Sequence, residues 1–152
     1  MLPSQQLAQF VADSKQLEAL CRELGRRGAT VHLKELVGGA LSFYAAAAIA
    51  RCGGLHIFVA EDRDAAAYLL NDFYNLLDES RICFFPSSYK RSIAYGGEDA
   101  QGVVQRTAAL AALRAHDDGY TVVCTYPEAL AERVADAETL RRDTIRVAVG
   151  DR

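Results

Sequence analysis

The stretch LHIFVAEDRDAAAYLLNDFYNLL, residues 55–77, decides the fold class of this chain. Its first six residues are apolar apart from one histidine, as in a short strand that is buried on both faces of a parallel sheet. Asp62 follows as a candidate helix cap. The apolar side chains after it recur at helical spacing and form the inner face of an amphipathic helix: Ala66, Leu69, Leu70, Phe73 and Leu77. A strand followed by a capped helix is the repeating unit of α/β proteins.

The same unit recurs along the chain. Besides residues 55–60, short apolar runs predict strands near 31–36, 82–85 and 120–125, and a further strand in TIRVAV, residues 144–149. Helices are expected over 41–51, over 98–115 and in PEALAERV, residues 127–134, where a proline occupies the first turn. In the 98–115 helix the apolar positions include Val103, Val104, Leu110 and Leu113. This alternation predicts a three-layer α/β/α fold with a mostly parallel sheet.

The first part of the chain has a different pattern. Leucines and other apolar residues recur at helical spacing up to Gly25, with a break near Ser14, so residues 1–28 are expected to form a helical segment. Residues 29–152 then form one α/β domain, since 152 residues suit a single domain better than two. Because the last predicted strand is followed at once by the end of the sequence, we expect a fragment of a longer multidomain protein.

Composition narrows the class of protein. Hydrophobic residues make up 51% and charged residues 24% of the chain, the balance of a soluble globular domain. A net charge of −3 argues against a domain that works mainly by coating nucleic acid. The longest apolar run, residues 40–50, is too short to cross a bilayer, and the N-terminus does not resemble a signal peptide. The expectation is a cytoplasmic protein with no membrane contact.

Cysteine and histidine, which often bind metals or transfer protons in proteins, are far apart in this sequence. Cys21, Cys52, Cys83 and Cys124 form no CxxC pair and have no histidine at zinc-site spacing, so we expect reduced, buried cysteines and no metal site. The histidines lie in separate elements and favour packing or hydrogen bonding over catalysis: His32, His56 and His116.

A glycine pair within LVGGALSFYAAAAIA, residues 36–50, is the first candidate site. Gly38 and Gly39 supply the backbone of a phosphate-binding loop at the start of a helix. The lysine that such a loop needs is replaced by Ala40 or Leu41, and Ser42 is the only hydroxyl in reach. ATP hydrolysis should fail here, because the outer phosphates lack their positive partner. A tight turn with no ligand is the favoured interpretation, and weak anion binding stays open.

A polar loop after the predicted strand at 82–85 is the second candidate site. Ligands of α/β proteins bind near strand ends, and this loop carries hydroxyls and positive charges that make a possible interaction surface: Ser87, Ser88, Lys90 and Arg91. A solvated loop with no ligand is an equally good interpretation. Glu98 and Asp99 suit the first turn of the next helix. The basic cluster of Arg141, Arg142 and Arg146 suits a solvated face.

Three segments together resemble a known family. They are FFPSSYKRSIAYGGEDAQGVVQRTAALAAL (84–113), TVVCTYPEALAERV (121–134) and LRRDTIRVAVGD (140–151). Their order resembles the first domain of bacterial transcription-repair coupling factors, which is similar to the first domain of the DNA-repair helicase excinuclease B. The matching features are Pro86-Ser87-Ser88, Glu98-Asp99, Arg106 and VVCTYPEAL at 122–130.

The resemblance implies a RecA-like (P-loop NTPase-like) domain whose nucleotide site at Gly38, Gly39 and Ser42 is degenerate. The segment would be a scaffold that is not an enzyme and binds no cofactor or metal, and that packs against neighbouring domains of its own chain. The full-length family is an ATP-dependent, Mg-dependent DNA translocase that displaces stalled RNA polymerase and recruits nucleotide excision repair through excinuclease A.

Two other functions stay open at this point. The first is the nucleotide-binding domain of a DNA helicase or translocase with a divergent but working P-loop. The second is a small α/β enzyme that acts through the 87–91 loop, for which the sequence offers no paired nucleophile and base.

Overall fold

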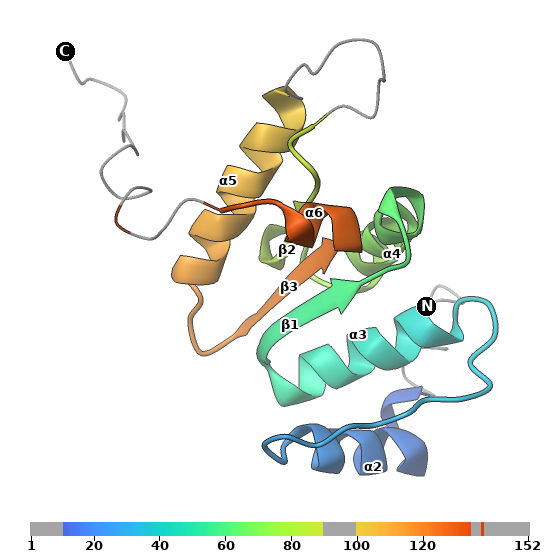
Figure 1. The fold of residues 1–152 in the computed structure, drawn as a ribbon. Helices are drawn as coiled ribbons and strands as arrows, with labels where there is room; N and C mark the ends of the chain where they lie inside the picture. Colours follow the sequence, from blue (N-terminus) through green and yellow to red (C-terminus); the bar gives the residue numbers. More distant parts are fainter. Residues whose placement is uncertain (1–10, 90–99, 135–137, 139–152) are drawn as a thin grey trace.

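A computed structural model describes residues 11–89, 100–134 and 138 of the chain. Figure 1 shows the arrangement of the elements. In chain order they are α2 (Lys15–Leu24), α3 (Ala40–Cys52), β1 (Gly54–Val59), α4 (Arg63–Leu76), the 3-10 turn η1 (Glu79–Arg81), β2 (Ile82–Phe85), α5 (Ala100–Arg114), β3 (Tyr120–Thr125) and α6 (Pro127–Ala131).

The strands form a small parallel sheet in the order β1-β3-β2. Phe58 of β1 pairs in register with Cys124 of β3, and Cys124 pairs with Phe84 of β2. Parallel neighbours require a crossover, and the helices between the strands provide it. The prediction of a mixed α/β fold with a parallel sheet is therefore confirmed, and the predicted strands near 55–60, 82–85 and 120–125 are present.

Helices cover both faces of this sheet. Phe73 of α4 packs against Phe58 with ring centroids 4.8 Å apart, on the face that Phe58 shares with Phe84. The guanidinium of Arg106 in α5 lies 4.1 Å above the ring of Phe85. Because Phe84 and Phe85 are consecutive in a strand, they point to opposite faces, so α4 and α5 lie on opposite sides.

The central strand carries the core. Val122 and Cys124 of β3 are fully buried, as are Ala66 and Phe73 of α4 and Ala109 of α5. The other predicted inner positions of α4 and the later leucines of α5 pack around this cluster as partly buried side chains: Leu69, Leu70, Leu77, Leu110 and Leu113. The amphipathic pattern in residues 62–77 is thus confirmed.

Helix ends follow local sequence signals. The Asp62 carboxylate accepts a hydrogen bond of 2.8 Å from the Ala65 N–H and begins α4. Ser14 caps α2 in the same way, at the break predicted near that residue. Gly53 ends α3 at a φ of 61°, and Pro127 is the first residue of α6. These predicted boundaries are confirmed.

The N-terminal helical segment packs on the α/β domain. Leu17 and Leu20 of α2 form a small buried cluster with Ala48 of α3, bordered by Tyr44 and Cys21. An apolar interface thus attaches α2 to α3.

The prediction of a strand near 31–36 is wrong. Residues 29–37 form no strand, and Glu35 adopts a φ of 63°, which interrupts an extended chain. Val37 is exposed. A strand needs a neighbour to pair with, and in the described part of the chain this segment has none.

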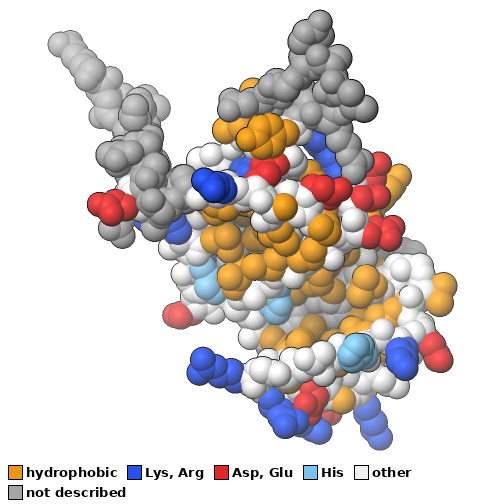
Figure 2. All heavy atoms as spheres, viewed as in Figure 1, with side chains coloured by type: hydrophobic (Ala, Val, Ile, Leu, Met, Phe, Trp, Pro, Cys, Tyr) orange, Lys and Arg blue, Asp and Glu red, His pale blue; other side chains and the backbone are white. Residues whose placement is uncertain are grey.

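The expectation that residues 55–60 are buried on both faces is also wrong. Leu55, Ile57 and Val59 are 47%, 53% and 53% exposed, and they alternate with less exposed residues along β1. The reason is that β1 is an edge strand of the described sheet, while α5 packs on β2 and β3. Figure 2 shows hydrophobic side chains gathered where β1 and β3 lie in Figure 1.

The inner face of α5 differs from the predicted one. Val103 and Val104 of α5 are 39% and 67% exposed, so the inner face of this helix is made by Gly102, Arg106 and Ala109 instead.

No helix within the described residues is both long and apolar enough to cross a bilayer. The predicted strand at 144–149, Glu98 and Asp99, and the arginines Arg141, Arg142 and Arg146 lie outside the described residues.

Candidate functional site

The glycine pair forms a turn that begins α3. Gly38 has a φ of 58°, which confirms that one of the two glycines adopts a conformation that a Cβ resists. Gly39 has a φ of −69° and is the N-cap. The N–H of Ala40 donates to the carbonyl of Val37 at 3.3 Å, so one of the free N–H groups at the helix start is already used. No strand precedes the turn within the described residues 11–37, so the turn is not the expected strand-to-helix junction.

Ser42 is turned away from this junction and into the protein. It is 5% exposed, and its hydroxyl donates to a carboxylate oxygen of Asp72 at 2.5 Å. The bond joins α3 to α4. The only hydroxyl that the sequence placed within reach of a bound phosphate is thus engaged between two helices. At the lysine position, Leu41 presents a side chain that is 43% exposed.

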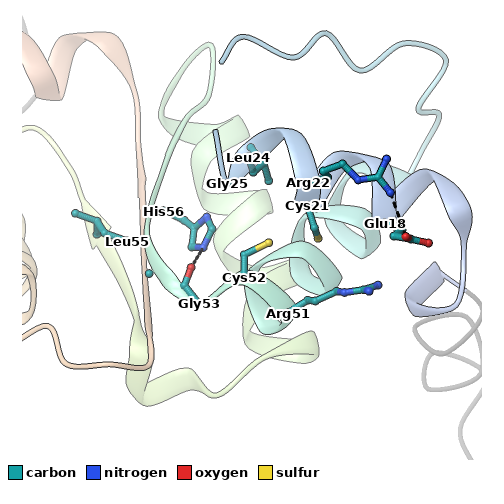
Figure 3. Close-up of a pocket in the computed structure, with 11 residues that line it drawn as sticks. Glu18, Cys21, Arg22, Leu24, Gly25, Arg51, Cys52, Gly53, Leu55 and His56 are labelled. Carbon is teal, nitrogen blue, oxygen red and sulfur yellow. Dashed lines mark hydrogen bonds and ion pairs between the residues drawn. The ribbon is translucent and has the colours of Figure 1, made fainter. Parts of the chain in front are cut away.

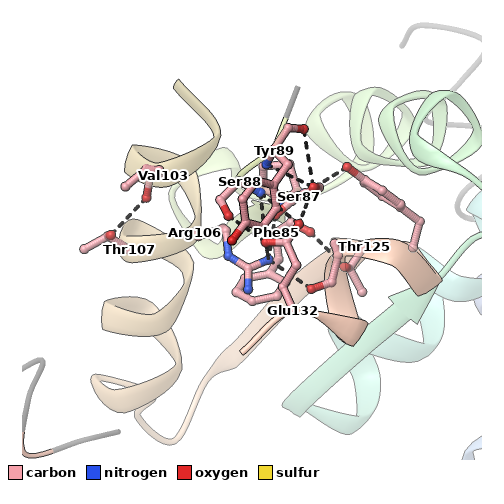
Figure 4. A network of polar contacts seen from close by, with 12 residues as sticks. Phe85, Ser87, Ser88, Tyr89, Val103, Arg106, Thr107, Thr125 and Glu132 are labelled. Atoms are coloured by element: carbon pink, nitrogen blue, oxygen red, sulfur yellow. Dashed lines mark hydrogen bonds and ion pairs between the residues drawn. The ribbon is translucent and has the colours of Figure 1, made fainter. Parts of the chain in front are cut away.

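The second candidate site binds a carboxylate from its own chain. The hydroxyls of Ser87 and Ser88 both donate to Glu132, as does the backbone N–H of Ser88 at 3.0 Å from Oε2 (Figure 4). The Ser87 N–H donates to the hydroxyl of Tyr126 at 2.8 Å. These serines therefore tie the end of β2 to the segment after α6. Lys90 and Arg91, the other residues of the predicted interaction loop, lie outside the described residues.

A buried arginine supports the same carboxylate. Arg106 Nη1 donates to the carbonyls of Pro86 and Ala129 at 2.8 and 2.9 Å and lies 3.4 Å from Glu132 Oε2. Its Nη2 is buried and has no hydrogen-bond partner within the described residues. The guanidinium of Arg106 also stacks on the ring of Phe85. We call Ser87, Ser88, Arg106 and Glu132 the Glu132 network.

Glu132 is held as an anion. Burial acts to raise its pKa, but the hydrogen bonds from Ser87 and Ser88 and the charge of Arg106 together outweigh burial and lower the pKa of Glu132. A carboxylate with a lowered pKa is a weaker proton acceptor than an ordinary glutamate. The network joins β2, α5 and the segment after α6.

Glu132 was missed in the sequence. It lies in PEALAERV, where its most natural interpretation is one more polar residue of a short helix. In the structure α6 ends at Ala131, and Glu132 adopts an extended conformation. Its serine partners lie more than forty residues earlier in the chain. No local pattern links two serines to a glutamate at that separation, and only the fold brings them together.

The histidines do not converge on a site. His56 Nε2 hydrogen-bonds with the Gly53 carbonyl at 2.8 Å, and His116 Nδ1 with the Thr121 hydroxyl at 2.9 Å. His56 in β1 and His116 in the loop between α5 and β3 are thus half-buried and hydrogen-bonded as expected, whereas His32 is exposed. Among the described residues, no group of three or more cysteine, histidine or acidic side chains could hold a metal ion.

The cysteines differ in their surroundings. All four are free thiols. Cys124 is buried as expected, and burial raises the pKa of its thiol to about 12. Cys52 is exposed, and Cys21 and Cys83 are half-buried, so the expectation of four buried cysteines is correct only for Cys124.

Comparison with known proteins returns no match. No protein-family model, no curated protein and no solved structure is similar to this chain at a significant level.

Proposed function

We propose that this chain is a non-catalytic α/β scaffold domain, RecA-like in architecture, with a degenerate nucleotide site at Gly38, Gly39 and Ser42. The Ser42–Asp72 hydrogen bond carries this proposal. A working P-loop presents its hydroxyl to magnesium and its lysine to the outer phosphates. Here the hydroxyl is bonded inside the protein, and alanine and leucine stand where the lysine is needed.

The contacts of the second candidate site support a structural role as well. The Glu132 network uses its polar groups on one another, so the loop at 86–88 has few free donors to offer a ligand. The half-exposed apolar face of β1 suits packing against a neighbouring domain. Both features fit a domain that positions other domains and needs no cofactor of its own.

The wider biological role is proposed from the family resemblance. The whole protein would be a cytoplasmic ATP-dependent DNA translocase that displaces stalled RNA polymerase and recruits excinuclease A for nucleotide excision repair. In that setting, ATP and magnesium would act in a separate motor, and this segment would be the N-terminal scaffold.

Isothermal titration with Mg-ATP tests the non-catalytic character. We expect no saturable heat from the purified chain, while a P-loop ATPase titrated under the same conditions serves as the positive control. Micromolar affinity would favour the alternative function, a nucleotide-binding domain of a helicase or translocase with a divergent P-loop.

The family assignment needs its own test, which is the reading frame that continues from Arg152. We expect a small domain there, followed by a motor with a complete P-loop lysine and hydroxyl. A stop codon directly after Arg152 would contradict the assignment to a coupling factor, and it would leave the titration result for this domain unaffected.

A further inference from the structure

A solvent-open cavity of about 660 Å³ lies where α2, the end of α3 and the start of β1 meet. Figure 3 shows its lining residues. Two thiols, from Cys21 and Cys52, and two guanidinium groups, from Arg22 and Arg51, line it. Neither the glycine junction nor the Glu132 network contributes to this cavity.

The two thiols are neighbours although they come from different helices. Cys21 lies on α2 and Cys52 is the last residue of α3, and in Figure 3 their sulfur atoms point toward one another. Partial burial, followed by the hydrogen bond and the charge of Cys21, raises the pKa of Cys52 to about 11, while Arg51 acts in the opposite direction. A thiol responds in this way to a second thiol only at close range.

We propose that Cys21 and Cys52 are a disulfide-forming pair, which a low-molecular-weight disulfide such as oxidised glutathione converts into a disulfide bond between α2 and α3. This inference is independent of the proposed function. It adds a covalent modification site at the interface between the N-terminal helical segment and the α/β domain.

Formation of the Cys21–Cys52 disulfide needs no oxidant other than the small disulfide. The thiolate of one cysteine attacks a sulfur of the small disulfide, whose S–S bond breaks and releases one small thiol. Because the pKa of Cys52 is raised to about 11, its thiolate is scarce near neutral pH and the exchange is slow, so the pair is brought to equilibrium over hours. The second cysteine then attacks the mixed disulfide, forms the Cys21–Cys52 bond and releases the second small thiol. The two cysteines are oxidised, the small disulfide is reduced to two thiols, and the two cysteine protons end on those products.

The surroundings are compatible with this reagent. Arg51 places positive charge on the wall of the same cavity, which attracts an anionic disulfide such as oxidised glutathione, while the charge of Arg22 is paired with the Glu18 carboxylate at 3.2 Å. Cys52 is exposed and Cys21 is half-buried, so the reagent can reach the pair. Formation of the bond ties together two helices that otherwise meet through a small apolar cluster.

The other two cysteines are not an equivalent pair. Cys83 precedes Phe84 in β2, and Phe84 pairs in register with Cys124 of β3. Side chains alternate between the faces of a sheet, so Cys83 and Cys124 point to opposite faces. Cys83→Ser therefore serves as the matched control, because it removes a thiol and leaves the proposed pair intact.

The experiment equilibrates the full chain with oxidised glutathione or with excess dithiothreitol. Intact mass and peptide mapping then identify the cross-linked cysteines, and thermal unfolding compares the two forms. We expect a Cys21–Cys52 linked peptide in wild type and in Cys83→Ser. We also expect Tm to rise on oxidation by on the order of 10 °C in both, because the cross-link restricts the unfolded chain.

Two variants make the result decisive. Cys21→Ser and Cys52→Ser should lose the linked peptide and the rise in Tm, while their reduced forms should unfold near the reduced wild type. A wild type that carries only glutathione adducts, or only unmodified thiols, after equilibration would overturn the proposal. A rise in Tm of equal size in Cys52→Ser would overturn it too.

Discussion

The hydroxyl of Ser42 in α3 donates to the carboxylate of Asp72 in α4 across 2.5 Å. Ser42 is 5% exposed, so water cannot readily replace Asp72 as the partner of its hydroxyl. It joins the helix that follows the glycine turn to the helix that packs on β2 and β3. The residue that suggested phosphate chemistry in the sequence thus stabilises the packing of two helices.

Ser42→Ala is expected to destabilise the fold. The substitution leaves Asp72 without its donor in a partly buried position, which costs about 1–3 kcal/mol in the free energy of unfolding. Urea denaturation measures the loss. Thr107→Ala is the matched control, because it removes an exposed helix hydroxyl that bonds only to the Val103 carbonyl, and its effect should stay within about 0.5 kcal/mol.

Leu41→Lys is expected to create no ATPase. The new ammonium group would stand at the lysine position, but the Ser42 hydroxyl would still be bonded to Asp72 and no magnesium partner would be gained. Phosphate release in the presence of Mg-ATP should stay at the background level of the wild type. Measurable turnover would mean that the remaining parts of a P-loop are intact.

The two glycines of the turn are expected to respond differently to substitution. Gly38→Val should cost about 1–2 kcal/mol, because Gly38 has a φ of 58° and a β-branched residue resists this region. Gly38→Asn should recover most of that stability, since asparagine tolerates the left-handed conformation.

Gly39 provides a second comparison for the same measurement. It has a φ of −69°, and the nearest atom to an added Cβ is 3.7 Å away on Phe43. Gly39→Ala should therefore cost less than Gly38→Val in thermal unfolding. Equal losses at the two positions would contradict the assignment of strain to Gly38.

Glu132→Gln is expected to make the free energy of unfolding less dependent on pH in the acidic range. The pKa of Glu132 lies below its ordinary value of 4.5 in the folded state, so its ionised form stabilises the fold. That contribution is fully present above pH 4.5 and is lost as pH falls through the lowered pKa. Urea denaturation from about pH 7 to about pH 3 should show a smaller fall for the variant than for the wild type.

At neutral pH the same variant should lose about 1–3 kcal/mol, because the amide replaces a charged acceptor of several hydrogen bonds. Glu61→Gln, at an exposed position outside the Glu132 network, is the control and should follow the wild-type profile. A wild-type pH dependence in Glu132→Gln would show that other carboxylates govern the acid transition.

Arg106 and Glu132 are expected to be energetically coupled. Arg106→Met removes the donor to two backbone carbonyls and the positive charge beside Glu132, and should cost about 3–5 kcal/mol. The double variant with Glu132→Gln should lose less than the sum of the two single losses, by about 0.5–3 kcal/mol. A double-mutant cycle in urea measures this coupling, and strict additivity would contradict it.

Features that depend on neighbouring residues were predictable from the sequence. The Asp62 and Ser14 caps, the glycine end of α3 and the proline start of α6 depend on groups within a few residues. The same holds for the positive φ at Gly38, which a glycine-rich turn favours locally. The strands at 54–59, 82–85 and 120–125 were found because their apolar runs are dense.

Features that depend on the whole fold were not predictable. The sequence 55–60 is apolar for most of its length, but only the sheet order β1-β3-β2 decides which of its side chains are covered. Residues 31–36 alternate as a strand does, and pairing partners rather than pattern determine the outcome. For the second candidate site, the sequence identified Ser87 and Ser88, and the fold supplied Glu132 as their partner.

The unpaired outer edge of β1 affects how the purified protein behaves in solution. Within the described residues no strand pairs with its outer edge, and its segment GLHIFV contains neither a proline nor an acidic, lysine or arginine side chain that would repel a second strand. Such an edge is a template for aggregation. Colloidal stability of the purified chain should therefore decline as its concentration rises, before any unfolding occurs.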